Sequence, residues 1–91
     1  MSYEILYVDK VVKHDIPKIS GIYKHRIKTA IETKLAQEPD LYGKPLRRSL
    51  KGYYKQRVGD YRVIFRIENN KVKIFVIAHR RVVYEIISTR I

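Results

Sequence analysis

The chain contains no cysteine and no tryptophan, and nine of its 91 residues are acidic. Without cysteine it can form neither a disulfide framework nor a thiolate zinc site. No apolar run approaches the roughly 18 residues of a membrane-spanning helix, and the first residues lack a secretory signal pattern. We therefore expect one cytoplasmic domain over residues 1–91, because a chain this short has room for a single core.

The charge that the chain does carry is strongly basic. Twenty lysines and arginines oppose the nine acids, which gives a net charge of +11. Residues 43–62 hold +6 of this surplus, because Asp60 is the single acid against seven cations: Lys44, Arg47, Arg48, Lys51, Lys55, Arg57 and Arg62. A localised run of cations interleaved with tyrosines is typical of nucleic-acid binding.

Hydrophobic periodicity predicts an α+β fold, in which two N-terminal helices pack on a small, mainly antiparallel sheet. We expect a first strand over residues 3–8, a short helix that stops near Pro17, and a second helix with Ser20 as its N-cap. The second helix ends at residues 38–40 and is followed by an irregular basic loop over residues 41–52. Its core-facing stripe contains Ile27, Ala30, Ile31 and Leu35.

The last third of the chain predicts three antiparallel strands and a terminal helix. The strands cover residues 53–58, 61–68 and 71–79, and the helix covers residues 82–89. Gly59-Asp60 and Asn69-Asn70 separate the strands. Both pairs tolerate a positive φ, so two tight hairpins are expected.

The hairpin register predicts a cationic face. Arg57 lies opposite Arg62, and Lys55 shares their face because side chains alternate along a strand. Two arginines in such a pair repel each other by roughly 0.2–1 kcal/mol, an arrangement that suits a phosphate placed between them.

Carrying the register through the second hairpin places Val63 opposite Val76 and Arg62 opposite Ile77, with His79 on the face of Arg62. The remaining assignments follow from the same alternation. The core face gains Val72, Ile74 and Val76. The cationic face carries three apolar residues that we expect the terminal helix or a partner to cover: Ile64, Phe75 and Ile77.

This face suits metal-free cleavage of RNA. Asp60 is the one carboxylate near it, so we expect no metal and no cofactor. Lys55, Arg57 and Arg62 would stabilise the charge on the phosphate, while a base removes the proton of the 2′-hydroxyl. The candidates for the base are Tyr84 and His79, and those for the acid are Arg81, Arg80 and His79. A tyrosine base needs neighbouring cations to lower its pKa.

Two segments carry a resemblance to a known family, YYKQRVGDYR at residues 53–62 and HRRVVY at residues 79–84. With the strand and two helices before them, they resemble the RelE/ParE toxin superfamily, on its RelE-like ribonuclease side. The resemblance implies a RelE-like fold and a type II toxin–antitoxin toxin that cleaves mRNA in the ribosomal A site without metal. It also implies residue roles: Lys55 and Arg57 as cations of the first hairpin strand, Arg62 as the phosphate-binding arginine, Arg81 as general acid and Tyr84 as general base.

The expected partners follow from the charge and the resemblance. An acidic, amphipathic antitoxin would wrap the basic surface, and mRNA, with the ribosome, would contact further cations: Lys44, Arg47, Arg48, Lys51 and Arg80. No membrane partner is expected. Two other functions stay open, a ParE-like toxin that inhibits DNA gyrase and a non-catalytic RNA-binding module.

Overall fold

The computed structural model describes residues 2–91, and its strands form one sheet in the order β1-β5-β4-β3-β2. β1 runs parallel to β5 and the other pairs are antiparallel, so the predicted α+β class with a mainly antiparallel sheet is confirmed. The strands are β1 (Glu4–Tyr7), β2 (Lys44–Pro45), β3 (Tyr54–Val58), β4 (Tyr61–Glu68) and β5 (Lys71–His79).

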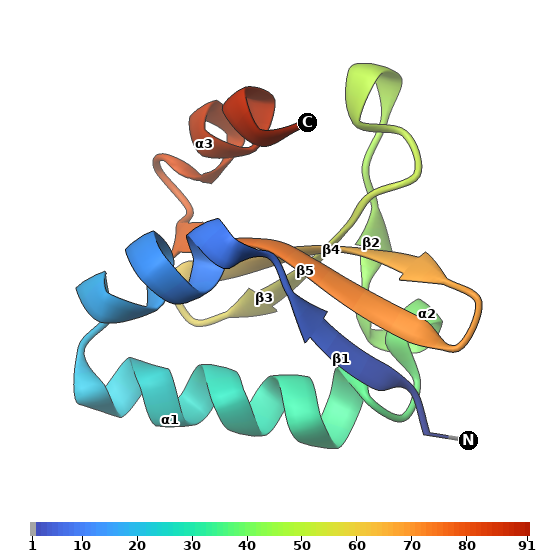
Figure 1. Cartoon of the computed structure of the whole chain (residues 1–91), viewed down its shortest axis with the longest axis horizontal. Helices are drawn as coiled ribbons and strands as arrows, with labels where there is room; N and C mark the ends of the chain where they lie inside the picture. The colour runs from blue at the N-terminus through green and yellow to red at the C-terminus, as the bar shows by residue number, and fades with distance from the viewer. Residues whose placement is uncertain (1) are drawn as a thin grey trace.

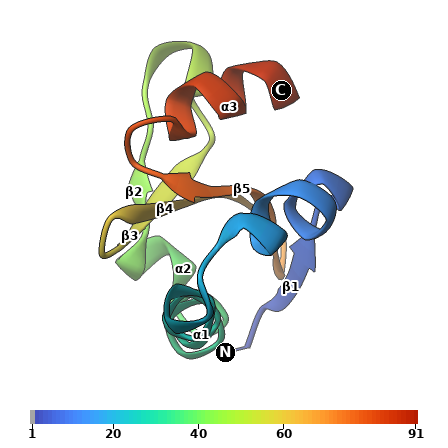
Figure 2. The same ribbon diagram turned by 90° about the vertical axis from the view of Figure 1, so that its left-hand side faces the viewer.

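Helical segments cover both faces of the sheet. Figure 2 shows the sheet nearly edge-on, with α3 on one side and α1 on the other. None of the helices within residues 2–91 is long and apolar enough to cross a membrane. The segments are η1 (Val11–Asp15), η2 (Ile16–Lys18), α1 (Gly21–Ala30), η3 (Ile31–Leu35), α2 (Pro39–Tyr42), η4 (Arg48–Leu50) and α3 (Val83–Arg90).

The helix boundaries follow the predicted signals with two refinements. Ser20 occupies the N-cap position of α1 with extended backbone, although its side chain makes no capping hydrogen bond. Pro39 begins the short helix α2, a position at which its missing N–H has no cost. The basic loop is partly ordered, because Lys44 pairs with Lys55 as an edge strand.

The core is divided by the sheet into two clusters of buried side chains. On the α1 side, the predicted stripe of the second helix packs against β4 and β5, and Ile27, Ile31 and Leu35 are buried there. On the opposite side, α3 covers a smaller cluster. Its buried members are Tyr53, Ile64, Val76, Ala78, Val83 and Ile87.

The first hairpin has the predicted register. Val58 lies opposite Tyr61 and Arg57 lies opposite Arg62. Gly59 has a φ of 58°, the left-handed conformation that the two-residue turn requires.

The second hairpin differs from the prediction, because β5 contains a β-bulge. Phe65 pairs with Ile74 but Ile64 pairs with Val76, which leaves Phe75 as an extra residue. One extra residue exchanges the faces of everything beyond it. The predicted pairs of Val63 with Val76 and of Arg62 with Ile77 are therefore wrong.

Because of the bulge, four side chains of β5 lie on the opposite face of the sheet from the one predicted. Ile77 lies opposite Val63 in the α1-side cluster, whereas Val76 lies under α3. Ala78 lies opposite Arg62, and His79 lies opposite Tyr61. The prediction that His79 lies on the face of Arg62 is therefore wrong.

Candidate functional site

The candidate site lies on the sheet face that α3 covers. Lys55 pairs with Ile64, which is buried under α3, so the lysine stands at the margin of that cluster. Figure 1 shows that the loop between β2 and β3 rises on the same side of the sheet as α3. Leu46 and Leu50 of this loop pack against the same cluster. The cationic face is thus flanked by α3 and by the 46–52 loop.

The structure brings Lys55 and Tyr84 into direct contact. The Lys55 ammonium donates a hydrogen bond to the Tyr84 hydroxyl oxygen at 3.1 Å, and it lies 5.8 Å from the centre of the phenol ring. Tyr84 is the second residue of α3 and is 42% exposed. A substrate can therefore reach both groups from solvent.

Arg62 is held in place by the hairpin turn. Its Nη1 donates to the carbonyl oxygens of Gly59 and Tyr61, both at 3.0 Å, and the side chain is half-buried. Arg57, opposite it in the register, is exposed. One arginine of the pair is therefore fixed by backbone carbonyls while the other is free to meet a ligand.

A hollow of about 310 Å³ connects these cations along the edge of β3. Its walls include four of the predicted residues, Lys44, Lys55, Arg57 and Arg62. Sequence reasoning missed the other three, Lys34, Tyr42 and Gln56. Lys34 and Tyr42 come from η3 and α2, where no local pattern marks them as neighbours of the hairpin. The buried amide oxygen of Gln56 has no hydrogen-bond partner within the described residues.

His79 contacts the turn that follows β5 and does not lie on the cationic face. Its ring packs edge-on against Tyr61, with ring centres 5.9 Å apart. Its Nδ1 accepts a hydrogen bond from the backbone N–H of Arg81 at 3.2 Å. The bulge at Phe75 is the physical reason for this placement, since it moves His79 across the sheet.

The two arginines after β5 have different surroundings. Arg80 lies over the first hairpin turn, where its backbone N–H donates to the Asp60 carbonyl at 2.8 Å. Its Nε is 3.9 Å from the Asp60 carboxylate, and both side chains are about half exposed. Arg81 is exposed. Asp60 therefore partly neutralises Arg80.

The remaining predicted cations, Arg47, Arg48 and Lys51, are exposed on the 46–52 loop. Arg48 has a φ of 58°, an unusual conformation for a residue other than glycine. Among residues 2–91, no three histidine or acidic side chains are grouped so that they could hold a metal ion. The site therefore offers several cations and the phenols of Tyr42 and Tyr84, groups that can hold a phosphate and exchange a proton with its substituents.

Solved structures place this fold among the RelE-type toxins. The toxin–antitoxin complex RelBE2 of Mycobacterium tuberculosis matches with a TM-score of 0.82 and 29% identity, over 88% of this chain and 100% of that chain. An Escherichia coli RelE variant bound to a RelB peptide matches with a TM-score of 0.67 over 100% and 99% of the two chains. Its identity is 19%, so this second likeness concerns the fold alone.

The sequence match identifies the family. Residues 6–84 match the family described as ParE toxin of type II toxin-antitoxin system, parDE, and the chain belongs to this family. The predicted membership of the RelE/ParE superfamily is thereby confirmed. The chain is 44% identical to Toxin RelG and 42% identical to Toxin RelE of M. tuberculosis, each over 52 residues. These matches cover 55% of this chain and 60% and 54%, respectively, of the two relatives.

Proposed function

We propose that this protein is a toxin that cleaves mRNA on the ribosome in the cytoplasm, with the RNA 2′-hydroxyl as nucleophile and no metal ion. The observation that supports this most directly is the contact between Lys55 and Tyr84, because it sets a phenol beside a phosphate-binding cation. The likeness to relatives named RelG and RelE supports the choice of an RNA-cleaving toxin.

The proposed reaction is a transesterification, in which the phosphorus exchanges its bond to the 5′-oxygen for a bond to the 2′-oxygen. Tyr84, as the phenolate, takes the proton of the 2′-hydroxyl, and that oxygen attacks the adjacent phosphorus. The bond to the 5′-oxygen breaks, and Arg81 donates a proton to this leaving oxygen. Lys55, Arg57 and Arg62 stabilise the negative charge on the pentacoordinate phosphate. The products are a 2′,3′-cyclic phosphate and a 5′-hydroxyl.

Contacts in the structure support a choice among the alternatives that the sequence left open. We assign the base to Tyr84 rather than His79, because His79 packs against Tyr61 on the other side of the sheet. We assign the acid to Arg81 rather than Arg80, because Arg80 lies beside the Asp60 carboxylate. Arg80, with the cations of the 46–52 loop and Lys44, instead contacts the RNA backbone.

The test is primer extension on cellular mRNA after induction of the wild type and of Tyr84→Phe. We expect discrete cuts with the wild type and a loss of cleavage of roughly 10²–10⁴-fold with the variant, the usual contribution of a general base. RNA affinity should stay within about twofold, because the cations remain. A wild type that makes no cuts would exclude the proposed function.

Tyr7→Phe provides a matched control for Tyr84→Phe. Tyr7 lies on the edge strand β1, which β5 and β4 separate from β3. Burial raises the pKa of the Tyr7 phenol above its ordinary value, and the nearby Glu32 carboxylate adds to the shift. This phenol therefore stays neutral at physiological pH, and its removal should leave the cuts unchanged.

A second candidate function is inhibition of DNA gyrase, which the description of the matched family as ParE toxins favours. A gyrase inhibitor needs no general base, so Tyr84→Phe would then remain toxic. DNA supercoiling by purified gyrase in the presence of the protein distinguishes the two functions. An RNA-binding module without catalysis would bind RNA and leave it intact.

We also propose an acidic antitoxin as the partner. The net charge of +11 and exposed apolar side chains such as Ile22 and Leu41 support it, as does the presence of antitoxins in the RelBE2 and RelE complexes. Induction of the protein alone should arrest growth, and co-expression of its antitoxin should restore it. Normal growth on induction alone would contradict this assignment.

A further inference from the structure

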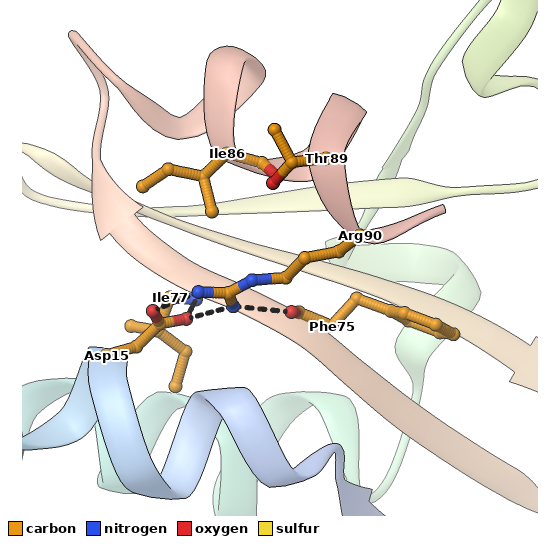
Figure 3. A network of polar contacts seen from close by, with 6 residues as sticks. All are labelled: Asp15, Phe75, Ile77, Ile86, Thr89 and Arg90. Carbon is orange, nitrogen blue, oxygen red and sulfur yellow. Dashed lines mark hydrogen bonds and ion pairs between the residues drawn. The ribbon is translucent and has the colours of Figure 1, made fainter.

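A buried ion pair joins the end of α3 to the N-terminal helical segment. Arg90 donates to both carboxylate oxygens of Asp15, each at 2.7 Å, and the two side chains are 10% and 6% exposed (Figure 3). The two residues are 75 positions apart in the sequence. A bidentate pair of this kind has strict directional geometry as well as strong attraction.

The pair also satisfies backbone groups at the free edge of β5. β1 ends at Tyr7, opposite Ile74, and no further strand within residues 2–91 lies beside β5 on that edge. There the N–H of Ile77 donates to Asp15 at 2.9 Å, and the carbonyl of Phe75 accepts from Arg90 at 3.0 Å. The ion pair therefore replaces the next strand at this point and fixes Arg90 to the sheet itself.

Apart from the hydrogen bond between Lys55 and Tyr84, the anchors of α3 within the described residues are mainly apolar. Val83 and Ile87 are buried one turn apart on the face toward the sheet, and Arg90 follows on the same face. Hydrophobic contacts are non-directional, so they hold the helix on the sheet but resist sliding and tilting weakly. A surface hollow of about 490 Å³ lies beside the pair, and residues of η1, the end of β5 and α3 line part of it.

We propose that Asp15 and Arg90 are positioning residues that hold Tyr84 against Lys55, an inference that rests on the proposed ribonuclease function. Eight residues are too few for a helix that is stable by itself in water, so the place of Tyr84 depends on the anchors of α3. The Lys55–Tyr84 distance is already 3.1 Å, and a further shift of about 0.5 Å ends the hydrogen bond.

The test is a double-mutant cycle on cleavage of a defined mRNA by the protein on purified ribosomes. Arg90→Lys keeps the charge but loses the planar fork, and Asp15→Asn keeps an acceptor for Ile77 but loses the charge. Each should lower kcat by roughly 10–100-fold with KM unchanged, the usual cost of misplacing a catalytic group by about 1 Å. In the Tyr84→Phe background each should change the residual rate by less than about threefold, because the group it positions is gone.

A second readout does not depend on activity. Amide hydrogen exchange in α3 should accelerate at least tenfold in Arg90→Lys, while exchange in β4 and β5 stays within about twofold. Ser88→Ala is the control, because Ser88 is exposed on α3 and its hydroxyl contacts the Glu85 carbonyl within the same helix. This control should alter neither kcat nor exchange.

The remaining outcomes each decide the question. If Arg90→Lys or Asp15→Asn lowers kcat by the same factor with Tyr84 present and in the Tyr84→Phe background, the inference is overturned. The ion pair would then act on the whole fold and not on the position of Tyr84. An Arg90→Lys protein that does not fold, or one with unchanged kcat, would overturn it as well. A wild type that binds the mRNA on ribosomes but never cuts it would instead refute the ribonuclease function, and this inference with it.

Discussion

The two faces of β4 differ in composition and in what they do. Toward α1 the strand presents apolar side chains, and Val63 and Phe65 are completely buried. Toward α3 it presents Arg62, Ile64 and Arg66, so one buried isoleucine lies between two arginines. The first face is a continuous core, whereas the second has a small core and leaves cations at its margin. A single strand can therefore supply stability on one face and, under the proposed function, a binding surface on the other.

Removal of a large side chain from the α1-side core should have the largest effect on stability. Phe65 is completely buried and stacks on Tyr54, with ring centres 5.6 Å apart. Phe65→Ala should lower the free energy of unfolding by about 3–5 kcal/mol, because it loses burial and leaves a cavity. Urea denaturation followed by circular dichroism measures this value. A loss below about 1 kcal/mol would show that this face is not the main core.

The α3-side core should respond less in stability and more in activity. Ile87 is completely buried, but its helix has eight residues. Ile87→Ala should cost about 2–3 kcal/mol in the same measurement, the low end for such truncations, because a short helix can settle into the space. It should also lower mRNA cleavage well beyond any unfolding, because α3 carries Tyr84. Full activity of the folded variant would contradict the role of this face.

Gly43 tests how tightly the α1-side core is packed against α2. A Cβ at this position would overlap Cζ of Phe65 and lie 2.9 Å from the carbonyl oxygen of Pro39. Gly43→Ala should therefore destabilise the protein by about 1–3 kcal/mol. Gly21→Ala is the matched control, since its Cβ would meet no atom within 4 Å. Equal unfolding free energies for the two variants would argue against this packing.

The smallest change in the free energy of unfolding is expected on the cationic face, where we expect a gain in stability and not a loss. Arg57→Gln removes the like charge opposite Arg62, so the free energy of unfolding should rise by roughly 0.2–1 kcal/mol at low salt. The gain should disappear at high salt, which screens exposed charges. Affinity for RNA should fall in the same variant. A loss of stability would mean that the two arginines do not repel each other.

Sequence periodicity predicted most elements of this fold, because they depended on local signals, but it missed β2 and η4 inside the expected loop over residues 41–52. The two hairpins follow from turn residues with a positive φ, and both Gly59 and Asn69 have it. The stripe of the second helix is buried as its spacing indicates. The register of Arg57 with Arg62 needed a count across one tight turn, and it is confirmed.

The parts that sequence reasoning missed depend on long-range contacts. The bulge at Phe75 has no marker such as glycine, and it alone moved His79 to the other side of the sheet. The sequence predicted Tyr84 at the edge of the face that carries Lys55. The hydrogen bond between the two side chains depends on where α3 lies, which local sequence does not determine. Nothing in the local sequence joins Asp15 to Arg90, because their partnership exists only after the sheet has formed.

The order of synthesis gives the Asp15–Arg90 pair a further consequence. Ribosomes make a chain from its N-terminus, and early segments begin to fold before later ones exist. Arg90 is made 75 residues after Asp15, so the ion pair and the anchoring of α3 come late in synthesis. Under the proposed function, Tyr84 would therefore take its place beside Lys55 only after every strand of the sheet has been made.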